Sequence, residues 1–251
     1  MPYGMYLSAA GAQAQNHRLE VISHNLANIN TPGFKPLMSV LQSRHAEAID
    51  QGETLAGSGG IDDLGGGVKA VPTRTQFQQG PIEQTKRPTD FAINNSKGFF
   101  VVQRGEEQLL TRAGDFVFNS NGTLTTTNGD PVMSITGGPI QVDPTKPYQV
   151  RDDGEIQQAG QIHRLQVVTP NSMGDLSRIG DNLYRPLAAT TPVPATQRQI
   201  VSGHLERSAV QPTTAMMELI EASRVYEANL RLIQHQDQSI GSLVGRLLKD
   251  S

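Results

Sequence analysis

The sequence predicts an α+β fold in which coiled-coil-like helices at the two ends of the chain pack together and the central part forms an all-antiparallel β domain. Apolar residues recur at helical spacing near both termini, whereas β-branched and aromatic residues concentrate between them and alternate with turn sequences. We therefore expect four segments: an N-terminal core helix over residues 1–35, a Gly-rich extended linker over 36–70, the β domain over 71–200 and a C-terminal core helix over 201–251.

The composition of the 251-residue chain excludes several classes of protein. Hydrophobic residues make up 36% and aromatic residues 5%, without any Trp, so a single core would be thin for this length. A net charge of -3 provides no field that attracts nucleic acid or an anionic membrane. The absence of Cys excludes disulfides, thiolate metal sites and Cys nucleophiles. No apolar run of about 18 residues is present, so we expect no membrane insertion, and the N-terminus lacks the features of a cleaved signal peptide.

The first helix is predicted from about Tyr6 to Ile29, a stretch without Pro. Its coiled-coil-like seam consists of Leu19, Ile22, Leu26 and Ile29. A second edge, whose smaller side chains permit close approach of another helix, consists of Leu7, Gly11, Ala14, Val21 and Asn25. Pro32 disfavours helical angles at Thr31, and Gly33 lets the chain turn away, so the helix should end just before this Thr-Pro-Gly sequence.

The middle of the chain is typical of strands joined by short turns. The stretch AGSGGIDDLGGG (residues 56–67) predicts a flexible linker or exposed loop. The clearest strands are FAI (91–93), GFFVVQ (98–103), QLLTR (108–112), FVF (116–118), TLTTT (123–127) and RLQVV (164–168). The sequences RGEE, SNG, NGD and DDGE supply the turns. No segment of helical length and period interrupts them, which favours an antiparallel β domain.

The C-terminal helix has the most regular periodicity in the chain. Its predicted seam alternates three- and four-residue steps and consists of Met216, Leu219, Ser223, Tyr226, Leu230, Ile233, Asp237, Ile240, Val244 and Leu247. Pro212, followed by Thr213 and Thr214, is typical of a helix start. Polar groups in such a seam more often set its register than perform chemistry.

Neither terminal helix can bury its apolar stripe alone. One interpretation is an intramolecular hairpin of the two helices beside the β domain. The other is that the paired helices also pack against neighbouring copies of the chain, because two seams and a small-residue edge exceed what one pair of helices buries. The periodicity is compatible with both interpretations.

Candidate catalytic groups are few. The histidines are scattered and lack metal-binding spacing, so we expect no metal and no cofactor; they are His17, His24, His45, His163, His204 and His235. The acidic pairs Asp62–Asp63 and Asp152–Asp153, with Glu155, lie in Gly-containing turns, where Asp is favoured for local hydrogen bonds. We interpret them as turn residues and expect no enzyme. The alternatives from other classes are a secreted hydrolase that uses Asp152, Asp153 or Glu155, and a secreted β-domain binding protein.

The stretch NLANINTPGFK (residues 25–35) resembles the N-terminal signature of the bacterial flagellar rod and hook axial proteins. The matching positions are Asn25, Ala27, Asn28, Thr31, Pro32, Gly33, Phe34 and Lys35. The C-terminal block is similar as well, through Gly203, Leu205, Glu206, Ser208, Val210, Ile220, Arg224, Tyr226 and Glu227. The family's β-domain run is matched by Gly98, Phe99, Phe100, Thr111, Arg112, Gly114 and Phe116. Ala209, in place of Asn, and Leu110, in place of Tyr, are departures.

The resemblance implies a non-enzymatic, structural subunit of the flagellar basal-body rod, which polymerises into the axial tube that transmits torque to the hook. Within the family the compact length and the C-terminal block are most similar to the proximal rod protein, and the distal rod protein is the alternative. The implied partners are copies of the chain, other proximal and distal rod subunits, and the flagellar type III export apparatus. That apparatus would deliver the chain from the cytoplasm to the periplasmic space without a cleaved signal peptide. No nucleic acid or small-molecule substrate is expected.

The residues expected at subunit contacts combine the helical seams with the two terminal motifs. They are Leu19, Ile22, Asn25, Leu26, Asn28, Thr31, Pro32, Gly33, Phe34, Met216, Leu219, Ile220, Arg224, Tyr226, Glu227, Leu230, Ile233, Ile240, Val244 and Leu247. The side-chain amides of Asn25 and Asn28 are expected to hydrogen-bond across a tight helix interface, and the Thr-Pro-Gly sequence to turn the chain outward.

Overall fold

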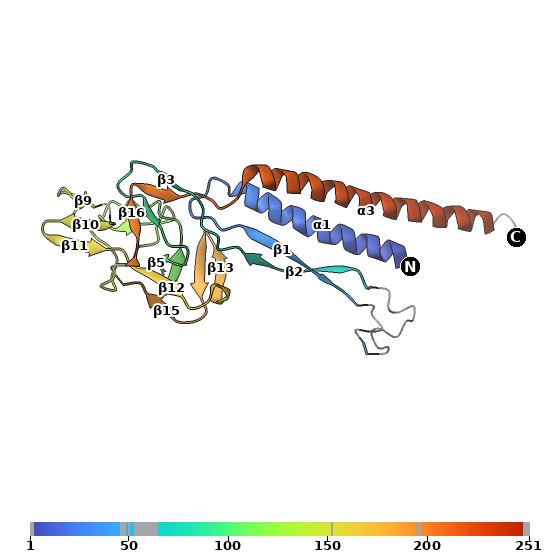
Figure 1. Cartoon of the computed structure of the whole chain (residues 1–251), viewed down its shortest axis with the longest axis horizontal. Coiled ribbons are helices and arrows are strands. Elements are labelled where there is room, and N and C mark those ends of the chain that lie inside the picture. The colour runs from blue at the N-terminus through green and yellow to red at the C-terminus, as the bar shows by residue number, and fades with distance from the viewer. Residues whose placement is uncertain are drawn as a thin grey trace. The chain divides into compact units, whose positions relative to one another are not determined.

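The computed structural model describes residues 3–45, 49, 51–52, 65–151, 153–194 and 197–247. The chain divides into two compact units, each described here by itself (Figure 1). Unit 1 contains Met1–Ala27, Leu37–Thr75 and Gln211–Ser251, and unit 2 contains Asn28–Pro36 and Gln76–Val210. The chain therefore passes between the units at four points along the sequence.

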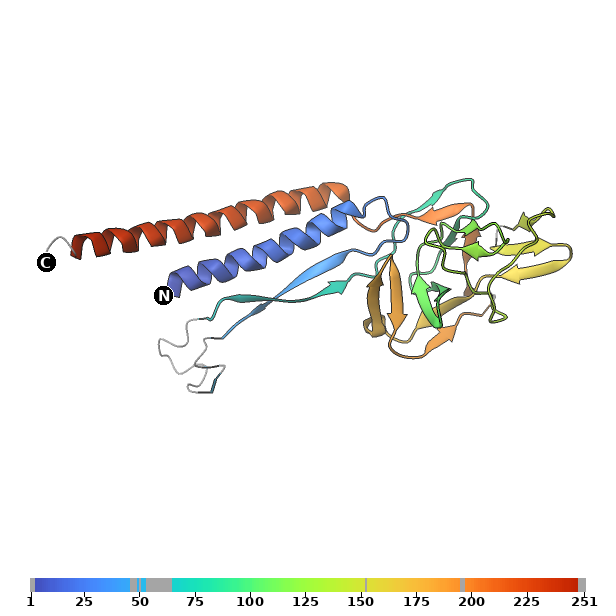
Figure 2. The ribbon, with the colours of Figure 1, turned by 180° about the vertical axis from the view of Figure 1, so that it is seen from behind.

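The predicted α+β class is confirmed. Helices α1 (Tyr3–Ala27) and α3 (Pro212–Leu247) lie side by side in unit 1, as the front and back views show (Figures 1 and 2). They run antiparallel, because Gly4 contacts Gln236 and Gly11 contacts Asn229. The C-terminal part of α3 continues past the beginning of α1 (Figure 1). Neither helix in the described part of the chain is long and apolar enough to cross a membrane.

Helix α1 ends at Ala27, two residues before the predicted end, and a turn follows in which the Thr31 amide donates to the Asn28 carbonyl at 3.2 Å. Gly33 then adopts a φ of +64°, in the left-handed region that favours glycine. A Cβ at this position would lie 2.4 Å from the carbonyl carbon of Arg112. The Thr-Pro-Gly sequence thus turns the chain as predicted, and the close approach of the Arg112 backbone requires the glycine.

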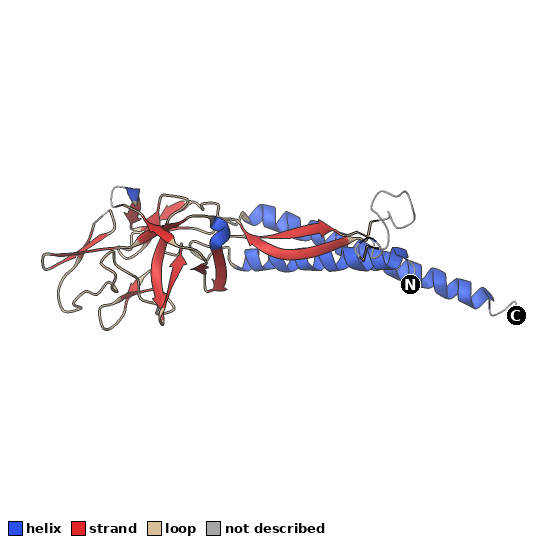
Figure 3. Cartoon of the chain, turned by 90° about the horizontal axis from the view of Figure 1, so that it is seen from below, coloured by secondary structure: helices blue, strands red, loops and turns tan. Residues whose placement is uncertain are grey.

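An antiparallel ribbon of β1 (Leu37–Ser43) and β2 (Val68–Thr75) runs along the helices of unit 1 (Figure 3). It contacts α1 through both strands. The sequence did not predict this pairing, because Val40 and its partner Val71 lie on opposite sides of the Gly-rich stretch. Asp62 and Asp63, between the strands, lie outside the described residues.

Unit 2 consists of short strands, and every pairing between its described strands is antiparallel. Its six-stranded sheet has the order β13-β14-β6-β5-β12-β15, a three-stranded sheet has the order β11-β10-β9, and the pairs β16-β4, β17-β3 and β7-β8 complete it. The bounds are β3 Ile82–Gln84, β4 Phe91–Ile93, β5 Phe99–Arg104, β6 Glu107–Thr111, β7 Val117–Phe118, β8 Leu124–Thr125, β9 Gln149–Val150, β10 Glu155–Gln158, β11 Gln161–Arg164, β12 Val167–Pro170, β13 Leu176–Gly180, β14 Leu183–Pro186, β15 Thr190–Pro192, β16 Ile200–Ser202 and β17 His204–Glu206. A 3-10 helix, η2, spans Met173–Asp175.

The predicted strands over 91–93, 98–103 and 108–112 correspond to β4, β5 and β6, and those over 116–118 and 123–127 contain the shorter β7 and β8. The stretch 164–168 was predicted as one strand, but β11 ends at Arg164 and β12 begins at Val167. Leu165 and Gln166 lie between these two strands and pair with a different segment. Leu165 forms a β-bridge with Ser134, and the Gln166 amide donates to the Met133 carbonyl at 2.9 Å.

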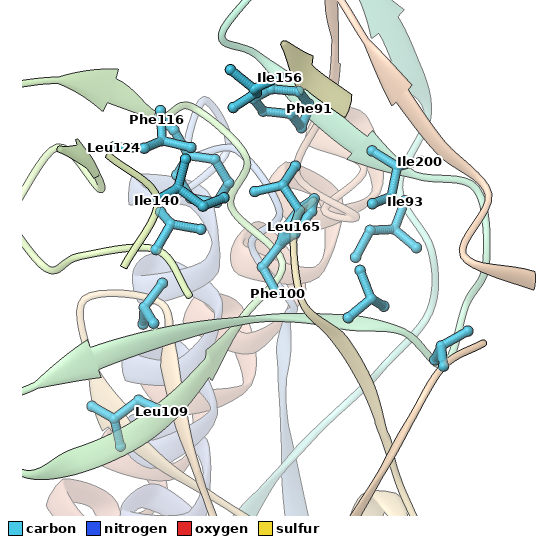
Figure 4. Close-up of a cluster of buried hydrophobic side chains, with 14 of the residues drawn as sticks. Phe91, Ile93, Phe100, Leu109, Phe116, Leu124, Ile140, Ile156, Leu165 and Ile200 are labelled. Atoms are coloured by element: carbon cyan, nitrogen blue, oxygen red, sulfur yellow. The ribbon is translucent and has the colours of Figure 1, made fainter. Parts of the chain in front are cut away.

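The few phenylalanines of the chain are concentrated in one unit. All seven phenylalanines of the sequence belong to unit 2. Phe100 packs edge-on against Phe116 at a centroid distance of 5.2 Å in the main core cluster (Figure 4). Phe99, on the opposite face of β5, joins a second cluster with Tyr184. Strand β5 is therefore buried on both faces, which explains its continuous apolar run.

Candidate functional site

Helix α3 packs on α1 through small and polar residues as well as large apolar ones. The buried and half-buried residues that alternate in steps of four and three are Ala215, Leu219, Ala222, Tyr226, Asn229, Ile233, Gln236 and Ile240. A Cβ at Gly11 would lie 3.0 Å from Asn229 Oδ1, and a Cβ at Gly4 would lie 2.7 Å from Gln236 Nε2. The glycines of α1 thus allow the two helices to approach closely.

Every second position of the seam predicted for α3 lies on the side that packs on α1. Leu219, Tyr226, Ile233 and Ile240 belong to the buried seam. The alternate positions do not pack on α1 in the same way: Met216, Leu230 and Asp237 are exposed and Ser223 is half-buried, and each follows by one position a buried or half-buried residue, Ala215, Ala222, Asn229 or Gln236. Apolar character favoured Met216 and Leu230 in the sequence, whereas the close approach of α1 leaves room for alanine or a polar side chain. Leu247 ends α3, and its side chain lies outside the described residues.

A second set of large apolar side chains on α3 is exposed. The large apolar residues of α3 that are more than a third exposed are Met216, Met217, Ile220, Val225, Leu230, Leu232, Leu243 and Val244. Met217 is 70% exposed, Leu243 58% and Ile220 52%. Large apolar patches that stay exposed mark sites of protein–protein interaction. We call these eight residues the outward face of α3.

The other C-terminal motif residues divide between the two sides. Arg224 and Glu227 are exposed, and Glu227 lies 3.9 Å from Arg231 on the next turn. On α1, Ile22 is buried and Leu19 and Leu26 are half-buried. The α1 seam is therefore largely used within the chain.

Asn25 serves a different purpose from the one predicted. Its side-chain amide donates to the Leu37 carbonyl at 2.7 Å and accepts from the Leu37 amide at 2.8 Å. We predicted a hydrogen bond across a helix interface, but the partner of Asn25 is the backbone of Leu37. The side chain pairs with Leu37 as a neighbouring strand would, and so fixes the start of β1. The Asn28 side-chain oxygen accepts from the Thr31 hydroxyl at 3.2 Å, within the turn after α1.

The Thr-Pro-Gly-Phe-Lys segment is fastened inside unit 2. Asn182 donates through its side-chain amide to the Pro32 carbonyl at 2.8 Å. Phe34 is 1% exposed, and the Arg178 guanidinium lies 4.7 Å from the centroid of its ring. These contacts fix the Thr-Pro-Gly-Phe-Lys segment inside unit 2 rather than on an exposed surface.

Lys35, Arg112 and Glu206 form a buried ion cluster in unit 2, which we call the clasp. Each of the three is at most 2% exposed. Lys35 Nζ lies 2.6 Å from Glu206 Oε1, and Arg112 Nη2 lies 2.7 Å from Glu206 Oε2. Arg112 also donates to the carbonyls of Asn95 and Gly98 at 2.7 and 2.5 Å. Motif residues from three distant parts of the sequence therefore meet at one carboxylate.

The clasp carries two positive charges and one negative charge in a desolvated site. Burial lowers the pKa of Lys35, and the neighbouring Glu206 carboxylate opposes that effect. Burial likewise lowers the pKa of Arg112, again against the attraction of Glu206. Such a cluster is stable only while each charge keeps its partner.

The clasp also joins the segments of unit 2 that lead to unit 1 along the chain. The Gly33 amide donates to the Glu206 carbonyl at 2.7 Å, and the Gly80 amide donates to Glu206 Oε1 at 3.0 Å. Lys35 Nζ donates to the Gln78 carbonyl at 2.6 Å. Glu206 therefore ties together the ends of 28–36, 76–81 and 203–210. The sequence shows each of the three motifs but not that Lys35, Arg112 and Glu206 meet. The one indication in the sequence was that each motif contains a charged residue.

The carboxylates of the hydrolase alternative have local partners. Asp153 accepts from the Glu155 amide at 3.2 Å, which is the turn role that the sequence predicted, and Glu155 pairs with Arg164. Both line a cavity of about 130 Å³ together with Arg198. Asp152 lies outside the described residues.

Comparison with known proteins gives matches along most of the chain. Residues 5–35 match the family model for flagella basal body rod protein, residues 92–162 the flagellar hook protein FlgE/F/G D1 domain, and residues 201–246 the flagellar basal body rod FlgEFG protein C-terminal domain. The chain is 34% identical to the flagellar basal-body rod protein FlgF of Caulobacter vibrioides, over 99% of each chain. It is 30% identical to the rod protein FlgG of Bacillus subtilis, over 96% of this chain and 97% of that one. It is also 30% identical to FlgG of Caulobacter vibrioides, over 93% and 95%.

Proposed function

Because the chain belongs to the family of flagellar basal-body rod proteins, we propose that it joins the rod through the outward face of α3. As a member of that family it is a structural subunit of the rod. The observation that supports the proposed contact is the exposure of Met216, Ile220, Leu230 and Val244 on a helix whose other side already packs on α1.

A helix with two apolar sides needs two partners. Helix α1 covers one side of α3, and Met216, Leu230 and Val244 of the outward face each follow an α1-facing heptad position by one residue. Burying such side chains stabilises an assembly by about 25 cal/mol per Å² of apolar surface. Copies of the chain and other rod subunits are the proposed partners, because paired terminal helices of neighbouring subunits offer surfaces of the same kind.

The predicted contact residues then divide into two roles. Met216, Ile220, Arg224, Glu227, Leu230 and Val244 face neighbouring subunits directly. The others act within the chain and hold the contact surface in place: Leu19, Ile22, Leu26, Leu219, Tyr226, Ile233 and Ile240 support the helix pair, while Asn25, Asn28, Thr31, Pro32, Gly33 and Phe34 fix the exit from α1. Leu247 continues the heptad position of Leu219, Tyr226, Ile233 and Ile240 at the end of α3.

We further propose that the chain acts without catalysis as a proximal rod subunit in the periplasmic space, after export in unfolded form by the flagellar type III apparatus. The Caulobacter relative named FlgF is more similar to this chain than the one named FlgG, at 34% against 30% identity. The distal rod position is the alternative.

The contact is tested by Ile220→Lys in the bacterium that carries the gene, with Gln234→Lys as the matched control at an exposed polar position of α3. We expect Ile220→Lys to abolish motility and rod completion, seen by electron cryotomography, while the purified variant unfolds at the temperature of the wild type. Motile cells with complete rods carrying Ile220→Lys together with Met216→Lys would show that α3 does not make the contact.

The position in the rod is tested by complementation. The chain is expressed in Caulobacter vibrioides strains that lack either FlgF or FlgG, and motility and rod length are measured. Restoration of the FlgF-deficient strain alone supports the role of FlgF for this chain, and restoration of the FlgG-deficient strain alone supports the role of FlgG. The rod length at which each deficient strain stops then gives the position. In the chain's own bacterium, complete rods and hooks after deletion of its gene would refute the rod role of this copy.

A further inference from the structure

Two aspartates face each other across a backbone bridge in unit 2. Asp90 and Asp115 form an antiparallel bridge, and the Phe91 amide donates to the Gly114 carbonyl at 2.9 Å. Because this hydrogen bond joins the residues beside the pair, the two aspartates occupy a non-hydrogen-bonded position of the ladder. Opposing side chains approach most closely at such positions, and like charges there are destabilising. The backbone therefore holds two carboxyl groups side by side.

Asp90 is 1% exposed, and within the described residues neither of its carboxylate oxygens accepts a hydrogen bond. The Arg87 Nε atom lies 3.8 Å from Asp90 Oδ1, but the Arg87 side chain is 60% exposed. A solvated arginine at that distance compensates a buried charge only weakly. A buried carboxylate without donors is costly to keep ionised.

Arg87 is the charged group, besides the aspartates, that the described residues place against the pair. Burial raises the pKa of Asp115 most, the charge of Asp90 raises it further, and Arg87 lowers it. On the opposite side the Gly203 amide donates to the Asp90 backbone carbonyl at 2.8 Å. The neighbouring His204 places its Nδ1 atom 2.8 Å from the Ser202 carbonyl.

We propose that Asp90 and Asp115 share one proton in mildly acidic solution, and that this proton stabilises unit 2. The protonated carboxyl donates its O–H to the other carboxylate, so oxygens that lack a partner gain one and the like-charge repulsion disappears. Adjacent carboxyl groups elsewhere in proteins titrate as a coupled pair in the same way.

The direction of the pH dependence follows from the raised pKa of Asp115. Between that value and the ordinary value of 3.8, the folded chain holds a proton that the unfolded chain releases. Stability therefore rises as the pH falls through this window, and the gain is lost again as the pH rises. Phe91 and Phe116, the residues that follow the two aspartates, pack at a centroid distance of 6.1 Å, so the bridge directly supports the core.

The shared proton is tested on the full chain labelled with ¹³C at the aspartate carboxyl carbons. Their chemical shifts are followed by NMR from pH 7 to pH 3, and the signals are assigned with Asp90→Asn and Asp115→Asn. We expect the Asp115 signal to titrate above the ordinary range, and its midpoint to move when Asp90 is replaced. Two independent titrations near the ordinary value would overturn the proposal.

Thermal unfolding gives a second readout. At neutral pH, Asp115→Asn should raise the midpoint by about 3 °C, because its amide donates to Asp90, and it should abolish the gain on acidification. Glu106→Gln, at an exposed carboxylate in the β5–β6 turn, is the control and should leave the pH dependence unchanged. Equal pH dependence of Asp115→Asn and the wild type contradicts the proposal. So does a shift of the Asp90 signal on adding Ca²⁺ at neutral pH, since the pair would then bind a cation.

Discussion

Replacement of Glu206 by Gln tests how the clasp holds unit 2 together. Gln keeps the shape of the side chain but removes the charge that faces Lys35 and Arg112. Both cations then remain buried with only neutral acceptors around them. We therefore expect this single change to be among the most destabilising in the chain.

The magnitude follows from the burial of all three residues, each at most 2% exposed. Removing one partner of a buried ion pair costs about 3–5 kcal/mol. Lys35→Met should cost less, because the clasp then retains Arg112 and Glu206 as a neutral pair. That variant loses the hydrogen bonds of Lys35 Nζ to Glu206 and to the Gln78 carbonyl, at about 1–3 kcal/mol for groups left unsatisfied.

Urea unfolding of the full chain measures these costs. Tyrosine fluorescence includes the fully buried Tyr184 of unit 2 together with the tyrosines of unit 1, while far-UV circular dichroism follows mainly the helices of unit 1. Non-coincident transitions would be analysed separately, since two units need not unfold together. Glu107→Gln is the matched control, because Glu107 pairs with Arg185 at 2.6 Å on an exposed surface, where about 0–1 kcal/mol is expected.

The order of the three variants in free energy of unfolding tests whether charge pairing stabilises the clasp. The reasoning requires Glu206→Gln to cost most, Lys35→Met less and Glu107→Gln least. A Glu206→Gln variant as stable as Glu107→Gln would show that the buried cations are compensated by other groups. A Lys35→Met variant less stable than Glu206→Gln would show that packing of the lysine chain, and not charge, governs the clasp.

Three further predictions concern single side chains. Burial raises the pKa of Tyr184 to about 12, and its hydroxyl has no hydrogen-bond partner among the described residues. Tyr184→Phe should therefore leave the stability unchanged near pH 7. In thermal unfolding it should remove part of the stability loss between pH 10 and 12. Asn25→Ala should cost about 1–3 kcal/mol and speed hydrogen exchange of the Leu37 amide, because both bonds to that residue are lost. Ala222→Leu should destabilise the helix pair by about 1–3 kcal/mol through overpacking, whereas Ala228→Leu on the exposed side of α3 should leave its circular dichroism melt unchanged.

The helices and the strands from β4 to β8 were predictable because their signal is local. Apolar periodicity marks α1 and α3, and continuous apolar runs such as Phe99–Val102 mark strands buried on both faces. The ribbon of β1 and β2 was not predictable in this way. Its pairing joins residues on either side of a Gly-rich stretch, and its apolar content is modest.

The contact residues were only partly predictable for a related reason. A hydrophobic pattern identifies the apolar residues of a helix but not which of them its neighbour covers. On α3, Met216 is the more apolar choice, yet Ala215 is the buried residue. The glycines of α1 decide this by bringing the backbones together, and their effect depends on the tertiary contact. The clasp likewise depends on three segments that only the fold brings to one place.

The division of α3 into two apolar sides bears on how a subunit enters an assembly. The side that faces α1 uses small residues such as Ala215 and Ala222, so the intramolecular pair is close but buries little apolar surface per residue. Met216 and Ile220, among the larger side chains, stay exposed. Under the proposed contact, a subunit gains further apolar burial from its neighbours. The ion cluster at Glu206 joins chain segments within unit 2, so we expect unit 2 to keep its fold when the contact is removed.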